Sequence, residues 1–357
     1  MFLVASKLGI TSFGGPVAHL GYFRSEYVQR RRWLDEETFA DIVALCQSLP
    51  GPASTEVGIA IGLLRAGPLG AFAAWLGFTS PSVILMVSFA YLDRLFELGW
   101  LFSILRLVAF AVVALAVWRM ARALAWDLPR GAIALASAAV VLAVPSPAIQ
   151  VAVIAAAGVI GWRFLHAPVT VTPAHIAVPI GRRAAAACLA IYLGLLAALP
   201  LAAAAVPTGG LRLVDSFYRS GALVFGGGHV VLPLLHAEVV PGWVSEEKFI
   251  AGYGAAQLMP GPLFTFAAYL GAAIQPAPLQ GDIFAPWPPH GPLGALLATL
   301  AIFLPAFLLV FAALPSWGAL RARPWARSAL RGVNAAVVGL LFAALVDIAR
   351  AIASTLV

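Results

Sequence analysis

The chain has 357 residues, of which 62% are hydrophobic and only 10% are charged. Soluble domains contain about 45–50% apolar residues, so a soluble fold of this length could not bury so much apolar surface. The net charge of +7 comes from short basic runs between apolar segments, and the sequence lacks the basic patches interleaved with aromatic residues that would indicate a nucleic-acid partner.

Apolar segments follow one another along the chain and predict an all-α polytopic membrane protein. A hydrocarbon core about 30 Å thick is crossed by about 20 apolar residues in a helix. Clear candidates cover residues 101–117, 132–144, 184–199 and 295–314. No cleavable signal peptide is visible at the amino terminus. Cys46 and Cys188 both lie inside apolar segments, so neither a disulfide nor a metal site is expected.

The first part of the chain returns in the last part, motif by motif and in the same order. The matched segments are Phe13-Gly14-Gly15-Pro16 with Phe225-Gly226-Gly227-Gly228, Trp33-Leu34-Asp35-Glu36-Glu37 with Trp243-Val244-Ser245-Glu246-Glu247, Gln47-Ser48-Leu49-Pro50-Gly51-Pro52 with Gln257-Leu258-Met259-Pro260-Gly261-Pro262, 67–71 with 291–295, Pro81 with Pro305, and Ser103, Leu105 and Arg106 with Ser328, Leu330 and Arg331. Six motifs at nearly constant offset indicate a duplication. We therefore predict an N-terminal repeat over 1–125, connecting membrane segments over 126–212, and a C-terminal repeat over 213–357. We call the two repeats copy one and copy two.

The charges between the motifs predict that the two copies are inverted relative to each other. Copy one carries Arg24, Arg30, Arg31 and Arg32 after its first motif, whereas copy two has only Lys248 among three glutamates. Cytoplasmic loops are rich in Lys and Arg, so the two stretches are expected on opposite sides. Re-entrant hairpins at the motifs leave seven full crossings, and kinked spans give eleven. Both counts predict that copy two is inverted, and re-entrant hairpins agree better with the positions of the basic residues. These hairpins place Arg94, Arg212, Arg219 and Lys248 outside.

Helix breaks are predicted at the four glycine and proline motifs. A break of this kind cannot expose unpaired backbone groups to lipid, so it must be buried in protein or face water. Two symmetric pairs of breaks predict a shared site where helix amino termini bind an anion. The alternative is a set of packing kinks with no ligand. The predicted binding residues in the breaks are Phe13, Gly14, Gly15, Pro50, Gly51, Pro52, Phe225, Gly226, Gly227, Gly228, Pro260, Gly261 and Pro262.

Neutral side chains beside the breaks complete the predicted binding site. Gln47 and Gln257 precede the two Pro-Gly-Pro segments, and Thr55 and Thr265 follow them. Their amide and hydroxyl groups can donate hydrogen bonds to oxyanion oxygens. The alternative for each of them is a hydrogen bond between helices.

Four titratable residues are predicted to couple protons or to gate the site: Glu26, Glu56, Glu238 and His229. Glu26 and Glu238 follow the glycine motifs at matched spacing, where they either cap the next helix or accept a proton. An ionised Glu56 just past the first Pro-Gly-Pro would repel an anion, so it either carries a proton or points away. His229 either titrates near neutral pH or is a packed, hydrogen-bonded residue.

These motifs resemble the chromate ion transporter family in its long, two-domain form. The resemblance is carried by the Phe-Gly-Gly-Pro segment followed by Glu and Trp, by the Gln-x-Leu-Pro-Gly-Pro segment, and by the return of both in copy two. Copy two departs from it with Gly228 in place of Pro16. The chain also begins almost at the first motif, without the polar leader usual in the family, which leaves a trimmed amino terminus as an alternative.

The resemblance implies a secondary transporter that confers chromate resistance by export across the inner membrane, driven by the proton-motive force. Its partners would be chromate or a sulfate-like oxyanion, protons and the lipid bilayer, with homodimer formation left open and no cofactor. An oxyanion channel, or a transporter of another small anion, is the alternative. A membrane enzyme is disfavoured because the sequence has no HExxH, GxSxG or phosphate-loop motif.

Overall fold

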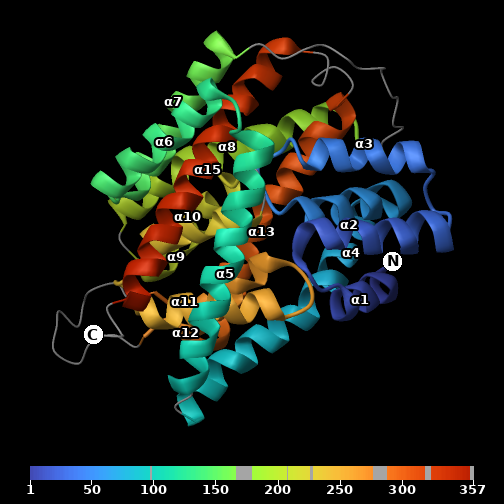
Figure 1. Ribbon diagram of the computed structural model, residues 1–357. Coiled ribbons are helices and arrows are strands. Elements are labelled where there is room, and N and C mark those ends of the chain that lie inside the picture. Colours follow the sequence, from blue (N-terminus) through green and yellow to red (C-terminus); the bar gives the residue numbers. More distant parts are fainter. Residues whose placement is uncertain are drawn as a thin grey trace.

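The computed structural model describes residues 1–96, 99–165, 179–206, 208–225, 228–275, 288–317 and 323–353. Every regular element in these ranges is a helix (Figure 1). In chain order they are α1 (Phe2–Thr11), α2 (Gly15–Phe23), the π-helix η1 (Arg24–Arg30), α3 (Glu36–Cys46), α4 (Ala53–Phe96), α5 (Gly99–Leu124), α6 (Leu128–Ala143), α7 (Pro147–Phe164), α8 (Arg182–Ala205), α9 (Gly209–Ala222), the short helix η2 (Gly228–Val230), α10 (Val231–Val239), α11 (Glu246–Leu258), the short helix η3 (Leu263–Thr265), α12 (Phe266–Ala273), α13 (Gly291–Ala313), the short helix η4 (Leu314–Ser316) and α15 (Pro324–Ala353).

Six of these helices are long and apolar enough to cross a membrane, which confirms the predicted all-α polytopic membrane protein. They are α4, α5, α7, α8, α13 continued by η4, and α15. Seven full crossings were predicted, and the seventh corresponds to α6. This helix has 16 residues, which at 1.5 Å per residue span about 24 Å of a core about 30 Å thick. On its own, α6 is therefore too short for a full crossing.

The helices of the two copies follow the same order along the chain. By the sequence repeat, α1 corresponds to α9, α2 to η2 and α10, α3 to α11, and α5 to α15. The long α4 corresponds to η3, α12 and α13 together. Its backbone leaves the helical region at Ala66 and Gly67, the place where copy two carries its extra segment. Residues 276–287 of that segment lie outside the described residues. The inversion of the copies stays a prediction.

Matched caps start α3 and α11. The Asp35 side chain accepts a hydrogen bond from the Thr38 N–H at 2.7 Å, and the Ser245 hydroxyl accepts one from the Lys248 N–H at 3.4 Å. Each cap satisfies a backbone donor that has no partner within the helix. Two glutamates in the first turn of each helix also stabilise it, because their negative charges lie at the positive end of the helix dipole. The same local sequence therefore starts the same helix in both copies.

The first helix of each copy crosses a long helix at a glycine. A Cβ on Gly9 of α1 would lie 2.6 Å from the carbonyl oxygen of Phe78 in α4, and a Cβ on Gly221 of α9 would collide with the carbonyl of Ile302 in α13. Phe78 and Ile302 are equivalent in the repeat, as are the two glycines. Small residues let helix backbones approach closely in membrane proteins. This crossing fixes where α1 and α9 end, and the glycine motifs begin there.

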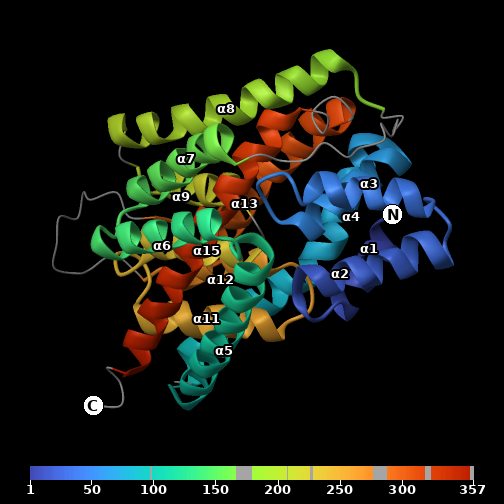
Figure 2. The ribbon, with the colours of Figure 1, turned by 45° about the horizontal axis from the view of Figure 1, so that its top comes forward.

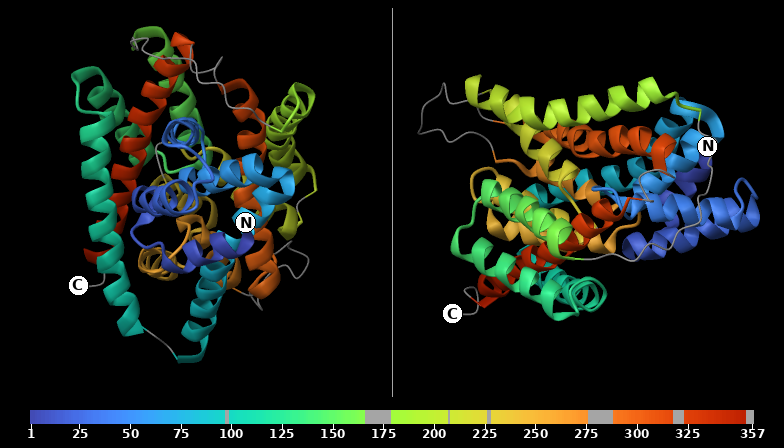
Figure 3. Two further views of the ribbon diagram at one scale, coloured as in Figure 1. Left: turned by 90° about the vertical axis from the view of Figure 1, so that its right-hand side faces the viewer. Right: turned by 90° about the horizontal axis from the view of Figure 1, so that it is seen from above.

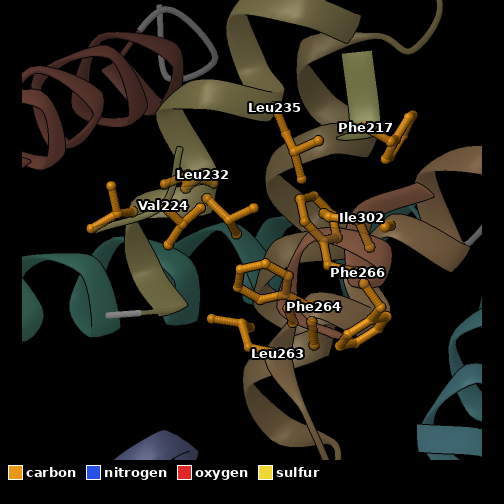
Figure 4. Close-up of a cluster of buried hydrophobic side chains, with 14 of the residues drawn as sticks. Phe217, Val224, Leu232, Leu235, Leu263, Phe264, Phe266 and Ile302 are labelled. Carbon is orange, nitrogen blue, oxygen red and sulfur yellow. The ribbon is translucent and has the colours of Figure 1, made fainter. Parts of the chain in front are cut away.

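Copy two supplies much of the buried core. Its α13 contacts α4, α8, α9 and α12. Figure 4 shows buried side chains that converge from α9, α10, α12 and α13, including Phe217 of α9, Leu235 of α10, Phe266 of α12 and Ile302 of α13. Fully burying a large apolar side chain contributes about 1.5–3 kcal/mol. Leu263 and Phe264, which directly follow the second Pro-Gly-Pro turn, belong to this buried cluster.

The remaining helices surround this core. The equivalent helices α5 and α15 run side by side (Figure 3), and α8 lies along α13 and α9 on an outer edge (Figure 2). In Figures 1 and 2, α1, α2 and α3 gather at the end of the molecule away from α6 and α7. The motif regions of copy one therefore enter the molecule from this end and meet copy two in the interior.

Candidate functional site

Two reciprocal hydrogen bonds join the motif regions of the two copies. The Gly51 N–H, in the first Pro-Gly-Pro turn, donates to the Val224 carbonyl of copy two at 2.7 Å. The Gly261 N–H, in the second turn, donates to the Ser12 carbonyl of copy one at 3.0 Å. Ser12 and Val224 are equivalent residues, each just before the glycine motif of its copy. Each Pro-Gly-Pro turn is therefore anchored on the glycine motif of the other copy.

Both turns require glycine at their centre. Gly51 has φ of +142° and Gly261 has φ of +94°, values that L side chains rarely adopt. A Cβ on Gly51 would collide with the Glu56 carboxylate, and a Cβ on Gly261 would lie 2.9 Å from the Ser82 Cβ. The prolines that flank these glycines, Pro50, Pro52, Pro260 and Pro262, are all buried. The chain can pass through this crowded region only as a tight turn without a central side chain.

The two glycine motifs also lie against each other. Pro16, in the first turn of α2, is 3.5 Å from the position that a Cβ on Gly228 would take. The other described residues of the motifs are exposed (Phe13, Gly14) or half-buried (Gly15, Phe225). Gly226 and Gly227 lie outside the described residues. Together with the reciprocal hydrogen bonds, this contact connects all four break regions into one continuous set, which we call the motif junction.

The two threonines of the predicted site have different surroundings. The Thr265 hydroxyl donates to the Pro262 carbonyl at 2.8 Å and lies 2.6 Å from the Ser82 hydroxyl. In copy two the position of Ser82 is occupied by Ala306, which has no hydroxyl. Thr55, the equivalent of Thr265, accordingly has a buried hydroxyl with no partner among the described residues. Of the two threonines, Thr55 has the hydroxyl left for another ligand.

The two glutamines also differ. Gln47 follows the last turn of α3 and is exposed, whereas Gln257 is half-buried at the end of α11. Gln257 lies one helical turn after Tyr253 on α11, and its Nε2 is buried without a partner among the described residues. The structure therefore brings Gln257 to a buried position at the junction, but leaves Gln47 on the surface.

Buried polar atoms without partners gather at the motif junction. Buried polar groups in proteins are nearly always hydrogen-bonded, to protein or to ordered water. Among the described residues, twelve buried side-chain atoms lack a partner, and five of these lie next to the four breaks. The five are Ser12 Oγ, Thr55 Oγ1, both carboxylate oxygens of Glu56 and Gln257 Nε2. Such a group of atoms indicates a place for water or for a polar ligand.

Glu56 lies in the first turn of α4, directly after the first Pro-Gly-Pro. Glu56 is 0% exposed, and its carboxylate lies against the turn at Gly51. Neither carboxylate oxygen has a hydrogen-bond partner among the described residues. The side chain therefore points toward the first Pro-Gly-Pro turn and not away from it.

Glu26 is a buried carboxylate surrounded by cations. It is 6% exposed and lies 2.7 Å from Arg31, 3.0 Å from Lys7 and 3.1 Å from Arg30. Burial acts to raise the pKa of Glu26, but the hydrogen bonds from Arg31, Lys7 and Arg30 outweigh it and lower the pKa to about 2. Glu26 is therefore ionised at neutral pH in this conformation, as an ion-pair partner.

Glu238, the equivalent of Glu26, forms the matching ion pair in copy two. Arg219 donates to its carboxylate at 3.2 Å, and the Ser216 hydroxyl donates at 2.8 Å. Arg219 and Lys7 are equivalent in the repeat. The structure places Arg219 in α9 with a 23% exposed side chain that also pairs with Asp215 at 2.7 Å. Its predicted position on the outer side of the membrane stays a prediction.

His229 lies in η2, directly after the second glycine motif. Its Nδ1 is 2.9 Å from the hydroxyl of Tyr253, which lies one helical turn before Gln257 on α11. This is the packed, hydrogen-bonded arrangement that the sequence left as one of two alternatives. His229, Tyr253 and Gln257 thus form a short polar line that ends at the second Pro-Gly-Pro turn.

Sequence reasoning missed Ser82 and Tyr253 at the motif junction, and Lys7, Asp215 and Arg219 in the ion pairs of Glu26 and Glu238. One signal was present in the repeat. Lys7 and Arg219 stand at the same offset from Glu26 and Glu238, so an equivalent cation and an equivalent carboxylate recur together. Ser82 and Tyr253 gave no such signal, because neither has a polar equivalent in the other copy.

Comparison with known proteins agrees with the motif pattern. A family model described as "Chromate transporter" matches residues 1–162 and 211–357. The chromate transport protein of Pseudomonas aeruginosa is 28% identical over 350 residues, which cover 96% of this chain and 79% of that protein. The chromate transport protein of Cupriavidus metallidurans is 27% identical, with 96% and 80% covered. The probable chromate transport protein of Synechococcus elongatus is 27% identical, with 96% and 82% covered.

No solved structure matches this chain. The family match takes in both copies and every motif from which the motif junction is built. With these motifs, the repeat and the membrane helices, the chain belongs to the chromate transporter family.

Proposed function

We propose that this protein exports chromate, and tetrahedral oxyanions of the sulfate type, across the inner membrane, driven by the proton-motive force. Membership of the chromate transporter family supports a chromate transport role, and the similar proteins of Pseudomonas and Cupriavidus are named chromate transport proteins. The direction of transport, the driving force and the wider substrate class are our additions.

The observation that carries the proposal is the pair of reciprocal hydrogen bonds from Gly51 and Gly261. Through them, broken helices from both copies meet at one place, which is where secondary transporters built from repeats bind their substrates. Helix α2 begins at Gly15 within the first glycine motif, and α4 and η3 begin directly after the Pro-Gly-Pro turns. A helix amino terminus offers free N–H groups and a partial positive charge to an oxyanion.

Neutral donors would complete the site around the oxyanion. The unpartnered Thr55 hydroxyl and Gln257 Nε2 are at the junction and can each donate one hydrogen bond. Hydrogen bonds to a charged group contribute about 1.5–3 kcal/mol each. A site made from backbone groups and neutral side chains binds a dianion weakly enough to release it during transport. Gln47, exposed in this conformation, would join the site only after α3 moves.

Glu56 is the proposed proton carrier. An ionised carboxylate that is fully buried without a partner costs several kcal/mol, so we propose that Glu56 is protonated in this conformation. Deprotonation beside the oxyanion would repel it. Proton binding and oxyanion binding at the junction would then depend on each other, which is the requirement for coupled transport.

Proteoliposomes test the proposal with two assays on the same protein. Counterflow of labelled chromate or sulfate measures exchange, and accumulation driven by a pH gradient measures coupling. We expect Glu56→Gln to keep exchange and to lose the driven accumulation. Glu37→Gln, on the exposed face of α3, should keep both. Driven accumulation by Glu56→Gln at the rate of the unchanged protein would contradict the proposed role of Glu56, and unitary conductance would assign the protein to the channels instead.

A further inference from the structure

Copy two contains a buried cluster with more carboxylates than cations, in addition to the motif junction. Arg219 lies 2.7 Å from Asp215 and 3.2 Å from Glu238, and both carboxylate side chains are nearly buried, at 9% and 11% exposure. The Ser216 hydroxyl donates to Glu238 at 2.8 Å. If both carboxylates were ionised, the cluster would carry a net charge of −1 in a buried position, which is costly.

Copy one shows the opposite balance at the equivalent position. There one carboxylate, Glu26, faces three cations. The residue equivalent to Asp215 is Leu3, so the second carboxylate exists only in copy two. Both copies therefore have an ion pair between a cation of their first helix and the equivalent glutamate. Copy two has a second carboxylate, Asp215, beside this ion pair.

No other cation within the described ranges compensates the extra carboxylate. Of the helices that pack against α9 and α10, α13 has no titratable residue, and α7 has one charged residue, Arg163, in its last turn. His236 of α10 pairs with Glu246, near Asp347 of α15. Arg350 of α15 pairs with Asp347, and the other arginines of α15, Arg327 and Arg331, lie in its first turns, whereas Asp347 lies near its end. His229 of η2 contacts Tyr253. The other cations on α8 and α9 are exposed: Arg182, Arg183 and Arg212. The remaining titratable groups are the free Cys188 and two tyrosines, Tyr192 and Tyr218, each of which donates a hydrogen bond from its hydroxyl to a backbone carbonyl.

Unpartnered buried atoms lie within the cluster and beside it. Asp215 Oδ1 and Arg219 Nε are buried without partners among the described residues. Ser220, 2% exposed, also has an unpartnered hydroxyl. It lies one helical turn after Ser216 on the same face of α9. Two residues past the end of α9 is Val224, whose carbonyl accepts the hydrogen bond from Gly51. These polar groups run from the cluster toward the motif junction.

We propose that Asp215, Arg219 and Glu238 form a proton-binding site in which two carboxylates share one proton and one guanidinium. In the protonation step one carboxylate takes up a proton and becomes a carboxylic acid. The bound proton brings the net charge of the buried cluster to zero. Burial raises the pKa of both carboxyl groups, against the opposing effect of Arg219, which is consistent with this assignment. The site is specific to copy two. Proton binding at this site does not depend on the proposed function; only a role of the bound proton in transport rests on it.

Infrared spectroscopy of the purified full chain tests proton binding without any transport. The carbonyl stretch of a protonated carboxylic acid is separate from the carboxylate bands, and it shifts in D2O. Difference spectra between the unchanged protein and each variant at neutral pH remove the contribution of other acids, including Glu56. We expect Asp215→Asn and Glu238→Gln each to remove the same band, one carboxylic acid per chain, because either change leaves one carboxylate paired with Arg219. Glu26→Gln, the matched control in copy one, should remove none.

Two results would overturn the shared site. One is that neither variant removes a carboxylic acid band. The other is that only one variant does, because the proton would then belong to a single carboxyl group. Each side-chain change is nearly isosteric, and two variants are used so that the failure of one to fold leaves the other readable. The outcome is independent of the Glu56→Gln transport experiment, so the proton site and the proposed function can fail separately.

Discussion

Equivalent substitutions in the two copies should have unequal effects on stability. Lys7→Met and Arg219→Met each remove the cation that links the first helix of a copy to the following glutamate. Lys7 is half exposed, and without it Glu26 keeps Arg30 at 3.1 Å and Arg31 at 2.7 Å. An exposed ion pair contributes about 0–1 kcal/mol. Lys7→Met should therefore be nearly neutral.

Arg219→Met leaves a different environment. Asp215 and Glu238, at 9% and 11% exposure, then have no cation within ion-pair distance among the described residues. Removing one partner of a buried ion pair costs about 3–5 kcal/mol. At roughly 2 °C of melting temperature per kcal/mol for a chain of this length, we expect a decrease of about 6–10 °C, against about 2 °C or less for Lys7→Met.

Scanning fluorimetry of the purified protein in detergent measures both shifts. The scan rate must be the same for all samples, because unfolding of membrane proteins is often irreversible and its midpoint then depends on that rate. Equal shifts for the two variants, or a larger shift for Lys7→Met, would refute the reasoning from burial and charge balance.

Three further predictions concern the junction and the topology. Gly261→Ala should lower stability by about 1–3 kcal/mol because of its positive φ, whereas Gly242→Ala, with open space around it, should change the melting temperature little. Ser82→Ala should cost about 1 kcal/mol through loss of its contact with the Thr265 hydroxyl, and a double-mutant cycle with Thr265→Val measures that contact separately. In a cysteine-free background, a cysteine at position 31 should be labelled only from the cytoplasm and one at position 246 only from outside; labelling of both from one side would contradict the inverted arrangement.

Much of the fold could be predicted from the sequence because its signals are local. Long apolar segments specify membrane helices directly, and glycine with proline specifies where a helix ends. The repeat also predicted the order of the helices. What the sequence did not supply was the surroundings of Arg219, which pairs with Asp215 and Glu238. The pairing with Glu238 joins two helices, and loop charge alone does not identify it.

The candidate site, like the fold, was predicted only in part. The four breaks are properties of the local backbone, so the motifs identified them, and the structure brings the break regions together. The side chains around them depend on tertiary contacts. Thr55 and Thr265 look identical in the sequence, yet only Thr265 meets a hydroxyl from α4, at Ser82. Gln47 and Gln257 likewise differ in burial. The roles of these residues in transport, and the inversion of the copies, stay predictions.

The reciprocal anchoring of the two turns has a consequence for biosynthesis. The Gly51 N–H finds its acceptor only when Val224 has been made, and Ser12 receives its hydrogen bond only when Gly261 has been made. Chains fold from the amino terminus as they leave the ribosome, so copy one must wait in the membrane with its first turn unanchored while the connecting helices are inserted. Its buried polar groups need water or a helper protein during that interval. The junction closes as one of the last events of assembly, and a nascent chain stalled before copy two would expose these groups to quality-control proteases.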